Sequence, residues 1–557
     1  MWHTKQRNSN FDATASFIWL SDIHLDPYYG QPNASKAKCT NSTLHPLGQF
    51  GCDASPLLFD AAIQRALDVQ QGDNTFVKFV ILTGDNCRHS TEWLDHPMNA
   101  TQDILKTVSN SLASAVTSWN QQQALLAKDG NDGSDPFGWQ LSIIPSIGNN
   151  DVTPDYFLNT DSWRKNNQTS SMLQMIAEGM APLFLTQEEK STFTKGGYFS
   201  RNINESLTIL SLNTIIYSIQ HEPHNSSDID PMDQFQWLEI KLQQCQEEHR
   251  FVYLVGHIAP SIGSYRHSQL WHDSYLQRYY EIYNSFQSIV KGQFYGHLHS
   301  DEFRIPDSSF LRPSQDDESK TNTGEKEEEK SIGPVLWMAS SITPVYGANP
   351  SIRRVYYKEE TGEVLDYVTH YLDLDDANQQ LLETTNETVT DVYEYEFEWK
   401  KGENFRDSFE LTNLSWEKLH AMVQEMELNQ KSFLWDVLLQ RQHVYRNDDS
   451  EKSEKEDCDD TCKVKWICTF SSITKEQYEA CVDRKLRDMD GDDGRNKLLP
   501  LQTIGFIGFV LGLTAVFIIV WKYRKQKKIQ YQQAEQGFAS SIEMMPQQQD
   551  VSIPEIT

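Results

Sequence analysis

The sequence is poor in basic residues relative to acidic ones. It contains 49 Lys and Arg residues against 79 Asp and Glu residues, which gives a formal net charge of −30 at pH 7. Binding to the phosphate backbone of DNA or RNA depends on a surplus of Lys and Arg, so no nucleic-acid partner is expected. Part of the acidic excess lies in residues 313–332 and 446–460, which lack apolar periodicity and are expected to be solvated, disordered loops.

Long apolar stretches are almost absent as well. Residues 498–521 carry no charge and are long enough to cross a bilayer as one transmembrane helix. A cluster of five basic residues within 522–528 follows directly, which predicts that the tail, residues 522–557, lies in the cytosol. Residues 1–15 are polar and contain no apolar segment of a signal peptide. We therefore expect either that an N-terminal leader is missing or that the final helix directs insertion.

Cysteine is also scarce, with eight residues in the chain of 557. Cys39 and Cys52 bracket one loop and are expected to form a disulfide. Four more cysteines lie close together in a charged region without histidine: Cys458, Cys462, Cys468 and Cys481. Their spacing is not the repeated Cys-x₂-Cys of a zinc site, so two disulfides of open connectivity are favoured over zinc. Cys87 and Cys245 either pair with each other or are buried thiols.

Eight Asn-x-Ser/Thr sequons are predicted to carry N-linked glycans. They begin at Asn33, Asn41, Asn99, Asn167, Asn204, Asn225, Asn386 and Asn413. A single sequon means little, because the pattern arises by chance. This number, together with paired cysteines, indicates the lumen of the secretory pathway.

Side chains that can bind metal ions follow five apolar stretches, each of which is typical of a buried strand. The stretches are 17–20, 79–82, 143–147, 252–255 and 293–295, and the segments after them are Asp22-Ile23-His24, Gly84-Asp85, Gly148-Asn149-Asn150-Asp151, Gly256-His257 and Gly296-His297-Leu298-His299. Parallel α/β sheets place their sites just beyond the carboxyl ends of strands. The five segments are therefore expected to converge on one point.

Taken singly, these segments have ordinary structural explanations. An isolated Asp-x-His is commonly a turn, and an aspartate after glycine commonly caps a helix. Turns and helix caps do not explain why five such segments occur in this order, each directly after a predicted strand. Their Asp, His and Asn side chains suit two divalent ions, with Zn, Mn, Mg, Co and Fe left open, and Asp85 is expected to bridge the two.

The order of these segments resembles the signature of the calcineurin-like metallophosphoesterases, over about residues 16–357. The resemblance implies an α/β fold in which two mixed β-sheets form a sandwich flanked by helices. It also implies the two ligand sets, Asp22, His24, Asp85 and His299 for one metal and Asp85, Asn149, His257 and His297 for the other.

Asn150 departs from that family's pattern, which has at this position a histidine that assists the leaving group. The Asn-Asn-Asp version, with the stretches 83–89 and 145–151, resembles the fungal vacuolar endopolyphosphatases, within the acid sphingomyelinase-like branch of the family. This resemblance implies cleavage of internal phosphoanhydride bonds of inorganic polyphosphate, with trimming of chain ends left open. A condensed phosphate is a good leaving group, so a strong acid at Asn150 would matter less.

Two other functions remain open. One is an acid sphingomyelinase-like phosphodiesterase that acts on lipid or nucleotide phosphodiesters. The other is a membrane-anchored, non-catalytic binding protein, against which the complete set of ligands argues. The negative charge of the chain opposes a polyanionic substrate such as polyphosphate, unless metal ions and local basic groups dominate the field at the site.

Two residues close to Asp85 are further catalytic candidates. His89, four residues on, is the candidate for a remaining acid or phosphate contact. Arg88 could pair bidentately with a phosphoryl oxygen or could form a structural salt bridge. His267, beside Arg266 in the loop after His257, is a weaker candidate for a phosphate contact.

The chain is expected to divide into a catalytic domain, a C-terminal subdomain and a membrane anchor. The predicted boundaries are 16–375 for the catalytic domain, 376–490 for a partly helical, Cys-containing subdomain, 498–521 for the membrane helix and 522–557 for the tail. Apolar spacing predicts helices over 60–69, 98–119 and much of 409–445. The expected location is the membrane of a vacuole or lysosome-like organelle, with the catalytic domain in the lumen.

Overall fold

The computed structural model describes most of the chain that precedes residue 492. The described residues are 15–40, 42–69, 75–129, 141–160, 170–306, 333–385, 397–446 and 458–491. The predicted membrane span, the cytosolic tail and the acidic insertion at 313–332 lie outside them. Within these ranges, no helix combines the length and apolar character needed to cross a membrane.

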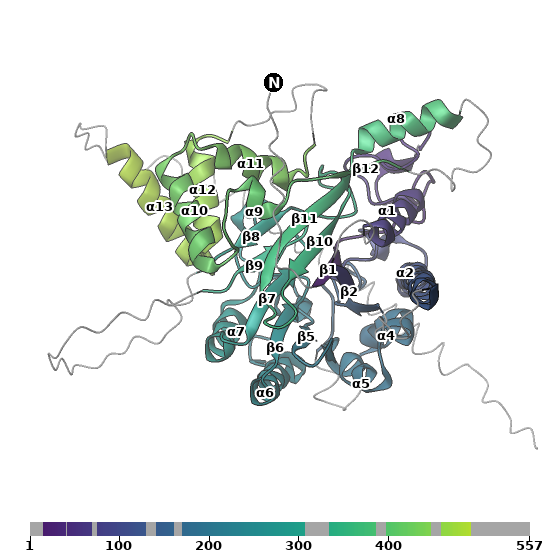
Figure 1. Cartoon of the computed structure of the whole chain (residues 1–557), viewed down its shortest axis with the longest axis horizontal. Helices are drawn as coiled ribbons and strands as arrows, with labels where there is room; N and C mark the ends of the chain where they lie inside the picture. The colour runs from purple at the N-terminus through teal and green to yellow at the C-terminus, as the bar shows by residue number, and fades with distance from the viewer. Residues whose placement is uncertain are drawn as a thin grey trace, which may run out of the picture. The chain divides into compact units, whose positions relative to one another are not determined.

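Two six-stranded sheets form the centre of the fold (Figure 1). The first has the order β12-β11-β10-β1-β2-β3 and the second the order β4-β5-β6-β7-β9-β8. The strands of the first sheet are β1 (Ala15–Leu20), β2 (Phe76–Leu82), β3 (Ser142–Pro145), β10 (Ser351–Tyr357), β11 (Val364–Leu372) and β12 (Trp399–Lys401). Those of the second are β4 (Phe199–Asn202), β5 (Leu207–Ser211), β6 (Phe251–Val255), β7 (Val290–Tyr295), β8 (Glu302–Arg304) and β9 (Leu336–Met338).

Both sheets are mixed, as predicted. In the first, β1, β2 and β3 run parallel, and the pairings of β1 with β10, β10 with β11 and β11 with β12 are antiparallel. In the second, β5, β6, β7 and β9 run parallel, with antiparallel β4 and β8 at the edges. All five strands expected to precede metal ligands are present, in the parallel parts of the two sheets.

The two sheets pack face to face through aromatic side chains. The ring of Phe294 on β7 lies 5.3 Å from that of Phe17 and 5.2 Å from that of Trp19, both on β1. Phe17 also stacks on Phe79 of β2 at 4.8 Å. Aromatic rings remove large apolar areas from water, so this layer contributes strongly to the core. It also brings the carboxyl ends of β1, β2 and β7 together.

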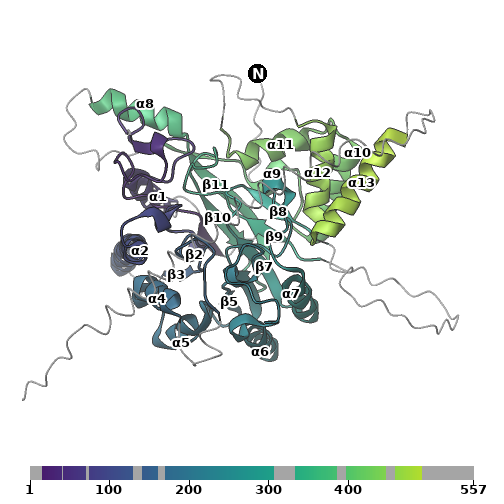
Figure 2. The same ribbon diagram turned by 180° about the vertical axis from the view of Figure 1, so that it is seen from behind.

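Helices cover the outer faces of the sandwich. In the two views of Figures 1 and 2, α1, α2, α4 and α5 lie beside β1, β2 and β3, and α6 and α7 lie beside β5, β6 and β7. The bounds are α1 (Pro56–Asp68), α2 (Pro97–Asp129), α4 (Ser171–Phe184), α5 (Gln187–Gly196), α6 (Gln234–Glu247), α7 (Asp273–Phe286) and α8 (Leu374–Thr385). α1 starts where Ser55 caps it, since the Ser55 hydroxyl accepts the Leu58 N–H at 3.0 Å and proline fits the first position.

The helices after residue 400 gather beside β8 and β9 (Figures 1 and 2). They are α9 (Phe405–Ser408), α10 (Trp416–Leu428), α11 (Phe433–Gln442), α12 (Asp460–Ser471) and α13 (Lys475–Gly491). A buried ionic group links α11 to the sandwich. Asp301 lies 2.7 Å from Arg353 of β10 and 3.0 Å from Arg441 of α11, and it accepts the Tyr367 hydroxyl at 2.6 Å. Because Asp301 follows His299 by two residues, this group also fixes the end of a metal-ligand loop.

The expected disulfides are present. Cys39 bonds to Cys52, Cys458 to Cys462 and Cys468 to Cys481, which resolves the open connectivity of the C-terminal cluster. Cys87 and Cys245 are buried free thiols. Three disulfides indicate an oxidising compartment, which fits a lumenal or extracellular domain.

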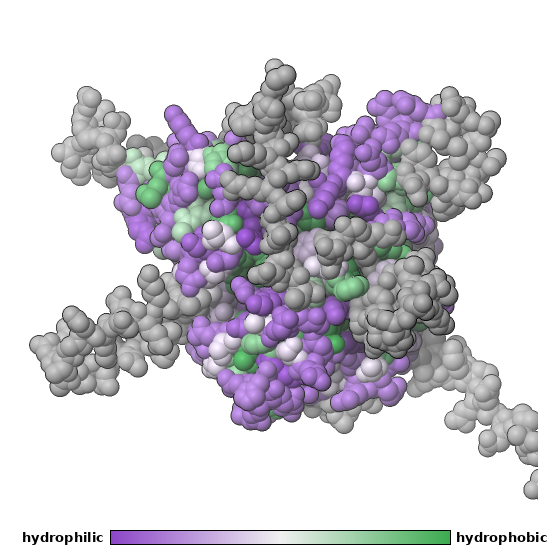
Figure 3. All heavy atoms as spheres, in the orientation of Figure 1, coloured by the Kyte–Doolittle hydropathy of each residue, from purple (hydrophilic) through white to green (hydrophobic). Residues whose placement is uncertain are grey.

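The coloured part of the face in Figure 3 is mostly hydrophilic, with apolar residues scattered over it. Of the predicted glycosylation sites, Asn33, Asn99, Asn225 and Asn413 are exposed and Asn204 is partly buried. Asn41, Asn167 and Asn386 lie outside the described residues. The exposed side chains are accessible to glycosylation, and the modification itself stays a prediction.

Candidate metal centre

The five predicted loops meet at one place, and the backbone bends sharply at most of the ligand positions. Asp22 and His24 after β1, Asp85 after β2, and His297 and His299 after β7 all have positive φ, from 45° to 72°. Such a conformation costs a residue other than glycine about 1–3 kcal/mol, and it persists only where the surroundings impose it. Five such residues in one site indicate that the fold sacrifices local stability to direct these side chains inward.

The first group contains four buried side chains from three loops. The ligand atoms of Asp22, His24, Asp85 and His299 all lie within 4.8 Å of one another. His299 Nε2 is 3.2 Å from Asp22 Oδ1 and 3.2 Å from His24 Nε2. Two imidazole nitrogens and two carboxylates that converge in this way match the donor set of a divalent cation.

The second group shares Asp85 with the first. Asp85 Oδ2 lies 3.4 Å from His24 Nε2 and 3.3 Å from His257 Nε2, so it stands between the two groups. His257 Nε2 is also 3.0 Å from Asn149 Oδ1, and His297 lies within the same cluster. His257 Nδ1 donates to the carbonyl oxygen of Thr83 at 2.7 Å, which leaves Nε2 for a ligand bond. The residues therefore fit two divalent ions with Asp85 between them, as expected from the sequence.

Burial and close charged neighbours shift the pKa values of the side chains in the cluster. Burial opposes ionisation of Asp85, but His257 and His24 outweigh burial and hold the pKa of Asp85 well below its usual range. Burial lowers the pKa of His24 and of His297 to about 3, so both imidazoles are neutral at physiological pH, as metal ligands must be. Against burial, Asp85 raises the pKa of His257 to about 9, so binding of a cation would release a proton from that ring.

Asn150 holds the bridging carboxylate. Its backbone N–H donates to Asp85 Oδ1 at 2.7 Å and its Nδ2 donates to Asp85 Oδ2 at 2.8 Å. An amide has no acidic proton to give to a leaving group, and the Nδ2 of this one donates to Asp85. Asn150 thus clamps the carboxylate that lies between the two groups.

Asp151, which the sequence analysis did not single out, joins the loops after β2 and β3. Its carboxylate accepts backbone N–H groups from Asp85 at 3.1 Å, Asn86 at 2.8 Å, Cys87 at 3.2 Å and Gly148 at 2.9 Å. Burial raises its pKa to about 6. The signal was present in the sequence, since Asp151 ends the Asn-Asn-Asp segment.

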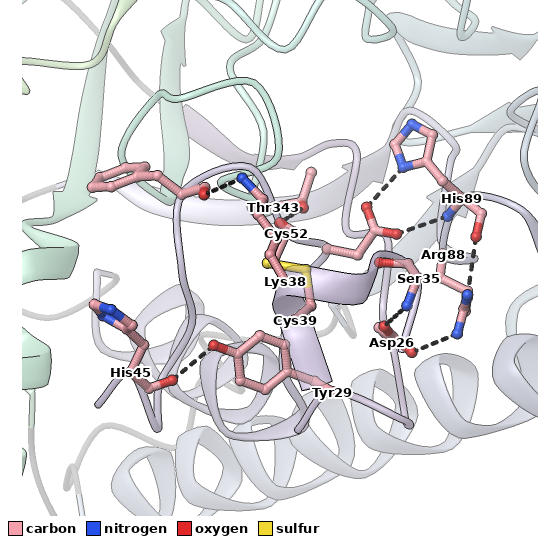
Figure 4. The surroundings of a disulfide bond; sticks show 12 residues. Asp26, Tyr29, Ser35, Lys38, Cys39, His45, Cys52, Arg88, His89 and Thr343 are labelled. Carbon is pink, nitrogen blue, oxygen red and sulfur yellow. Dashed lines mark hydrogen bonds and ion pairs between the residues drawn. A yellow bond between two sulfur atoms is a disulfide. The ribbon is translucent and has the colours of Figure 1, made fainter. Parts of the chain in front are cut away.

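His89 lies at the edge of the first group and is held by Asp53. Its ring stacks on that of His24 with centroids 4.1 Å apart. His89 Nδ1 is 2.7 Å from Asp53 Oδ1, and its backbone N–H donates to Asp53 Oδ2 at 3.0 Å (Figure 4). Burial alone would lower the pKa of His89, but the Asp53 carboxylate outweighs it and raises the pKa. Asp53 follows Cys52, so the Cys39–Cys52 disulfide secures the loop that carries it.

Arg88 forms a structural salt bridge, which is one of the two roles that the sequence left open; the other was a contact to a phosphoryl oxygen. Its Nη1 lies 3.0 Å from Asp26 Oδ1, and its Nε donates to the His89 carbonyl at 3.0 Å (Figure 4). The same Nη1 is 2.5 Å from the Asn33 carbonyl oxygen. Its side chain is only 3% exposed. The guanidinium therefore supports the loop around His89 and is not presented to a substrate.

His267 is likewise engaged elsewhere. Its Nδ1 is 2.8 Å from Thr469 Oγ1 of α12, and its ring stacks on Tyr478 of α13 at 5.2 Å. Two aromatic residues that the sequence analysis did not assign lie nearer the metal ligands. The rings of Tyr346 and Tyr156 lie edge to face against His299 and His297, with centroids 4.7 Å and 6.2 Å apart.

The chain is similar to several known proteins. No model of a known protein family matches the chain. It is 30% identical over 328 residues to a sphingomyelinase phosphodiesterase D of Dictyostelium discoideum, a match that spans 59% of this chain and 62% of that protein. It is 25% identical over 488 residues to human cyclic GMP-AMP phosphodiesterase SMPDL3A, which spans 84% of this chain and 90% of that one. A dimetal phosphatase from Danio rerio aligns structurally with a TM-score of 0.33 at 13% identity, over 64% of this chain and 96% of that one.

Proposed function

We propose that the chain is a dinuclear-metal phosphodiesterase of the acid sphingomyelinase-like type, which acts on nucleotide or lipid phosphodiesters. The observation that carries the reaction class is the position of Asp85 between two groups of buried His, Asp and Asn ligands. The substrate class is supported by the relatives, whose names describe phosphodiesterases. The sequence-based preference for polyphosphate thus gives way to the phosphodiesterase alternative.

The ligand groups define what the centre can do. When bound, two divalent cations activate water for attack on phosphorus and neutralise charge on the phosphoryl oxygens. Asp22, His24, Asp85 and His299 would hold one cation, and Asp85, Asn149, His257 and His297 the other. Asn150 and Asp151 keep Asp85 and its loop in place by the hydrogen bonds described above.

His89 is the residue of this chain best placed to handle a proton of the leaving group. Asp53 binds Nδ1, so the other ring nitrogen, Nε2, faces Tyr346, whose hydroxyl is 3.4 Å away. Its side chain is 23% exposed and can therefore be reached by a substrate. A raised pKa favours the protonated ring, which is the form that donates. Asp53 is a positioning residue in this scheme, because it acts only through His89.

Inorganic polyphosphate remains a second candidate substrate, and Asn150 is the observation that favours it. A site with no acid at this position suits a leaving group that needs no proton. The phosphate released from a phosphoanhydride is such a leaving group. Internal cleavage, with or without trimming of chain ends, would follow from the same two ligand groups. The buried, ion-paired state of Arg88 weakens this candidate, because one expected contact to a polyanion is lost.

A substrate panel separates the candidates. The purified protein with Zn²⁺ or Mn²⁺ is given a dinucleotide diester, sphingomyelin and long-chain polyphosphate, and initial rates are measured for each. We expect turnover of a phosphodiester at a rate well above that of polyphosphate. Shortening of the polyphosphate ladder without hydrolysis of either diester would favour the second candidate. No turnover of any substrate by protein with bound metal would indicate a binding protein.

The proposed location is the lumen of a vacuole or lysosome-like organelle, or the cell exterior. The three disulfides support an oxidising compartment. Anchoring by residues 498–521 stays a prediction from the sequence, because this segment lies outside the described residues. Alkaline extraction of membranes that contain the full chain and a chain truncated at residue 490 tests it. Retention of the full chain alone would support the anchor.

A further inference from the structure

A chain of buried hydrogen bonds lies behind the first metal-ligand group. The indole Nε1 of Trp19 on β1 donates to Thr83 Oγ1 at 3.0 Å, and Thr83 Oγ1 lies 2.6 Å from Ser21 Oγ. The Ser21 hydroxyl in turn donates to Asp22 Oδ2. All four side chains belong to residues that are at most 1% exposed, so water does not compete for these hydrogen bonds.

The direction of this chain of bonds is fixed at both ends. An indole N–H can only donate, and the ionised carboxylate of a metal ligand can only accept. Thr83 therefore accepts from Trp19 and donates its own hydroxyl proton to Ser21, since the alternative acceptor, the Leu20 carbonyl, is 3.4 Å away. Ser21 accepts from Thr83 and donates to Asp22. Successive hydrogen bonds that point the same way polarise and strengthen one another.

The two oxygens of Asp22 have different partners as a result. Oδ2 accepts from Ser21, whereas Oδ1 lies 3.2 Å from His299 Nε2 in the first ligand group. The backbone nitrogen of His297 lies 3.0 Å from Oδ2 and 3.1 Å from Oδ1. At Gly296, a Cβ would clash with Ser21 Oγ and would lie 2.6 Å from Asp22 Oδ2. Glycine at this position therefore leaves room for the hydroxyl behind the ligand.

Thr83 also serves the second ligand group. Its carbonyl oxygen accepts His257 Nδ1 at 2.7 Å, while its hydroxyl contacts Ser21. One residue thus orients a histidine of one group through its backbone and an aspartate of the other group through its side chain. Hydrogen bonds of this kind behind a metal ligand typically change metal affinity or activity by about 10- to 100-fold.

We propose that Trp19, Thr83 and Ser21 form a hydrogen-bond relay, the hydroxyl relay, that positions Asp22 for the cation of the first ligand group. This inference rests on the proposed function, because it assigns positioning residues to the same dinuclear centre. The three residues are not ligands. Trp19 and Thr83 act on Asp22 only through Ser21, and Ser21 acts by holding Oδ2 so that Oδ1 faces the first group.

Metal binding tests the hydroxyl relay without any turnover. The metal-free full chain is titrated calorimetrically with Zn²⁺, and Asp22→Asn, which alters a ligand of the first group alone, identifies the binding event of that group. Ser21→Ala is expected to weaken this event about 10- to 100-fold and to leave the other event unchanged. Ser16→Ala is the matched control, because Ser16 is a fully buried serine at the opposite end of β1 whose hydroxyl donates to the Phe76 carbonyl at 3.3 Å. It should change neither event.

Variants of Thr83 test the order of the relay. Thr83→Val removes the hydroxyl but keeps the carbonyl, so it should weaken the first-group event less than Ser21→Ala does and leave the second-group event unchanged. In the Ser21→Ala background it should have little further effect, since Thr83 acts through Ser21. Thr83→Ser keeps the hydroxyl and should keep both affinities. Ser21→Cys keeps a weak donor and should give a loss smaller than that of Ser21→Ala.

Three results would overturn the hydroxyl relay. Equal weakening of both events in Ser21→Ala would assign Ser21 to packing, and unchanged binding would mean that Asp22 needs no support from it. Additive losses in the Thr83→Val, Ser21→Ala double variant would mean that the two residues act separately. A wild-type chain that bound no Zn²⁺ would refute the dinuclear centre and the relay together. The expected losses of affinity without hydrolysis of any diester would uphold the relay and reject the proposed function alone.

Discussion

Asp85→Asn is expected to reduce turnover of phosphodiesters at least a thousandfold. Asp85 Oδ2 faces both His24 and His257, so this one carboxylate serves both ligand groups. A neutral amide removes the negative charge that two bound cations would share. Such charge stabilisation is worth several kcal/mol, with about 1.4 kcal/mol for each factor of ten in rate. The measurement is kcat together with the metal content of the purified variant.

We expect the variant to retain fewer than two metal ions per chain while its circular dichroism spectrum is unchanged. Asp60→Asn is the matched control, because Asp60 is an exposed aspartate on α1. It should keep both the rate and the metal content of the wild type. Turnover near the wild-type value in Asp85→Asn would contradict the bridging role of this residue.

His89→Ala is expected to give the second-largest loss, of about a hundredfold to a thousandfold, which is the lower part of the usual range for removal of a general acid. The ring stacks on His24 but contributes no atom to either proposed ligand set, so the two metal ions should be retained. The loss should be largest for substrates with poor leaving groups and small for p-nitrophenyl esters, since nitrophenolate leaves without a proton. Rates for a series of diesters that differ only in leaving group measure this dependence.

Two controls separate an acid from a structural support. Exposed His224→Ala should have no effect on any substrate. Asp53→Asn should lower the rate about tenfold and show the same leaving-group dependence, but have little further effect in the His89→Ala background, since Asp53 acts through His89. Near-normal turnover in His89→Ala would mean that another group donates the proton. A loss that is equal for all leaving groups would assign His89 to support of the metal ligands.

Much of the centre could be predicted because strand and ligand stand next to each other in the sequence. An apolar run of three to five residues followed by Gly-Asp or Gly-His-x-His specifies both a buried strand and the side chains at its end, and parallel pairing then brings these ends together. The pairing of Cys39 with Cys52 follows from a pattern of the same local kind, whereas the two mixed sheets were expected only from the resemblance to the metallophosphoesterases.

The residues that were missed depend on contacts between distant segments. Asp53 reaches His89 across 36 positions and Tyr346 reaches it across 257, and no local pattern reveals either contact. Arg88 was ambiguous for the same reason, because only the fold reveals that Asp26 takes up its guanidinium. Asn150 could be recognised as unusual, but its role as a clamp on Asp85 required the geometry of two loops.

The central claim is that two divalent ions bound at Asp85 are required for hydrolysis. Metal-free protein is titrated with Zn²⁺ or Mn²⁺, and phosphodiester hydrolysis is measured against the equivalents of bound metal. The account predicts no activity without metal and a rate that rises to a plateau at two equivalents per chain. A plateau at one equivalent, or hydrolysis by metal-free protein, would contradict it.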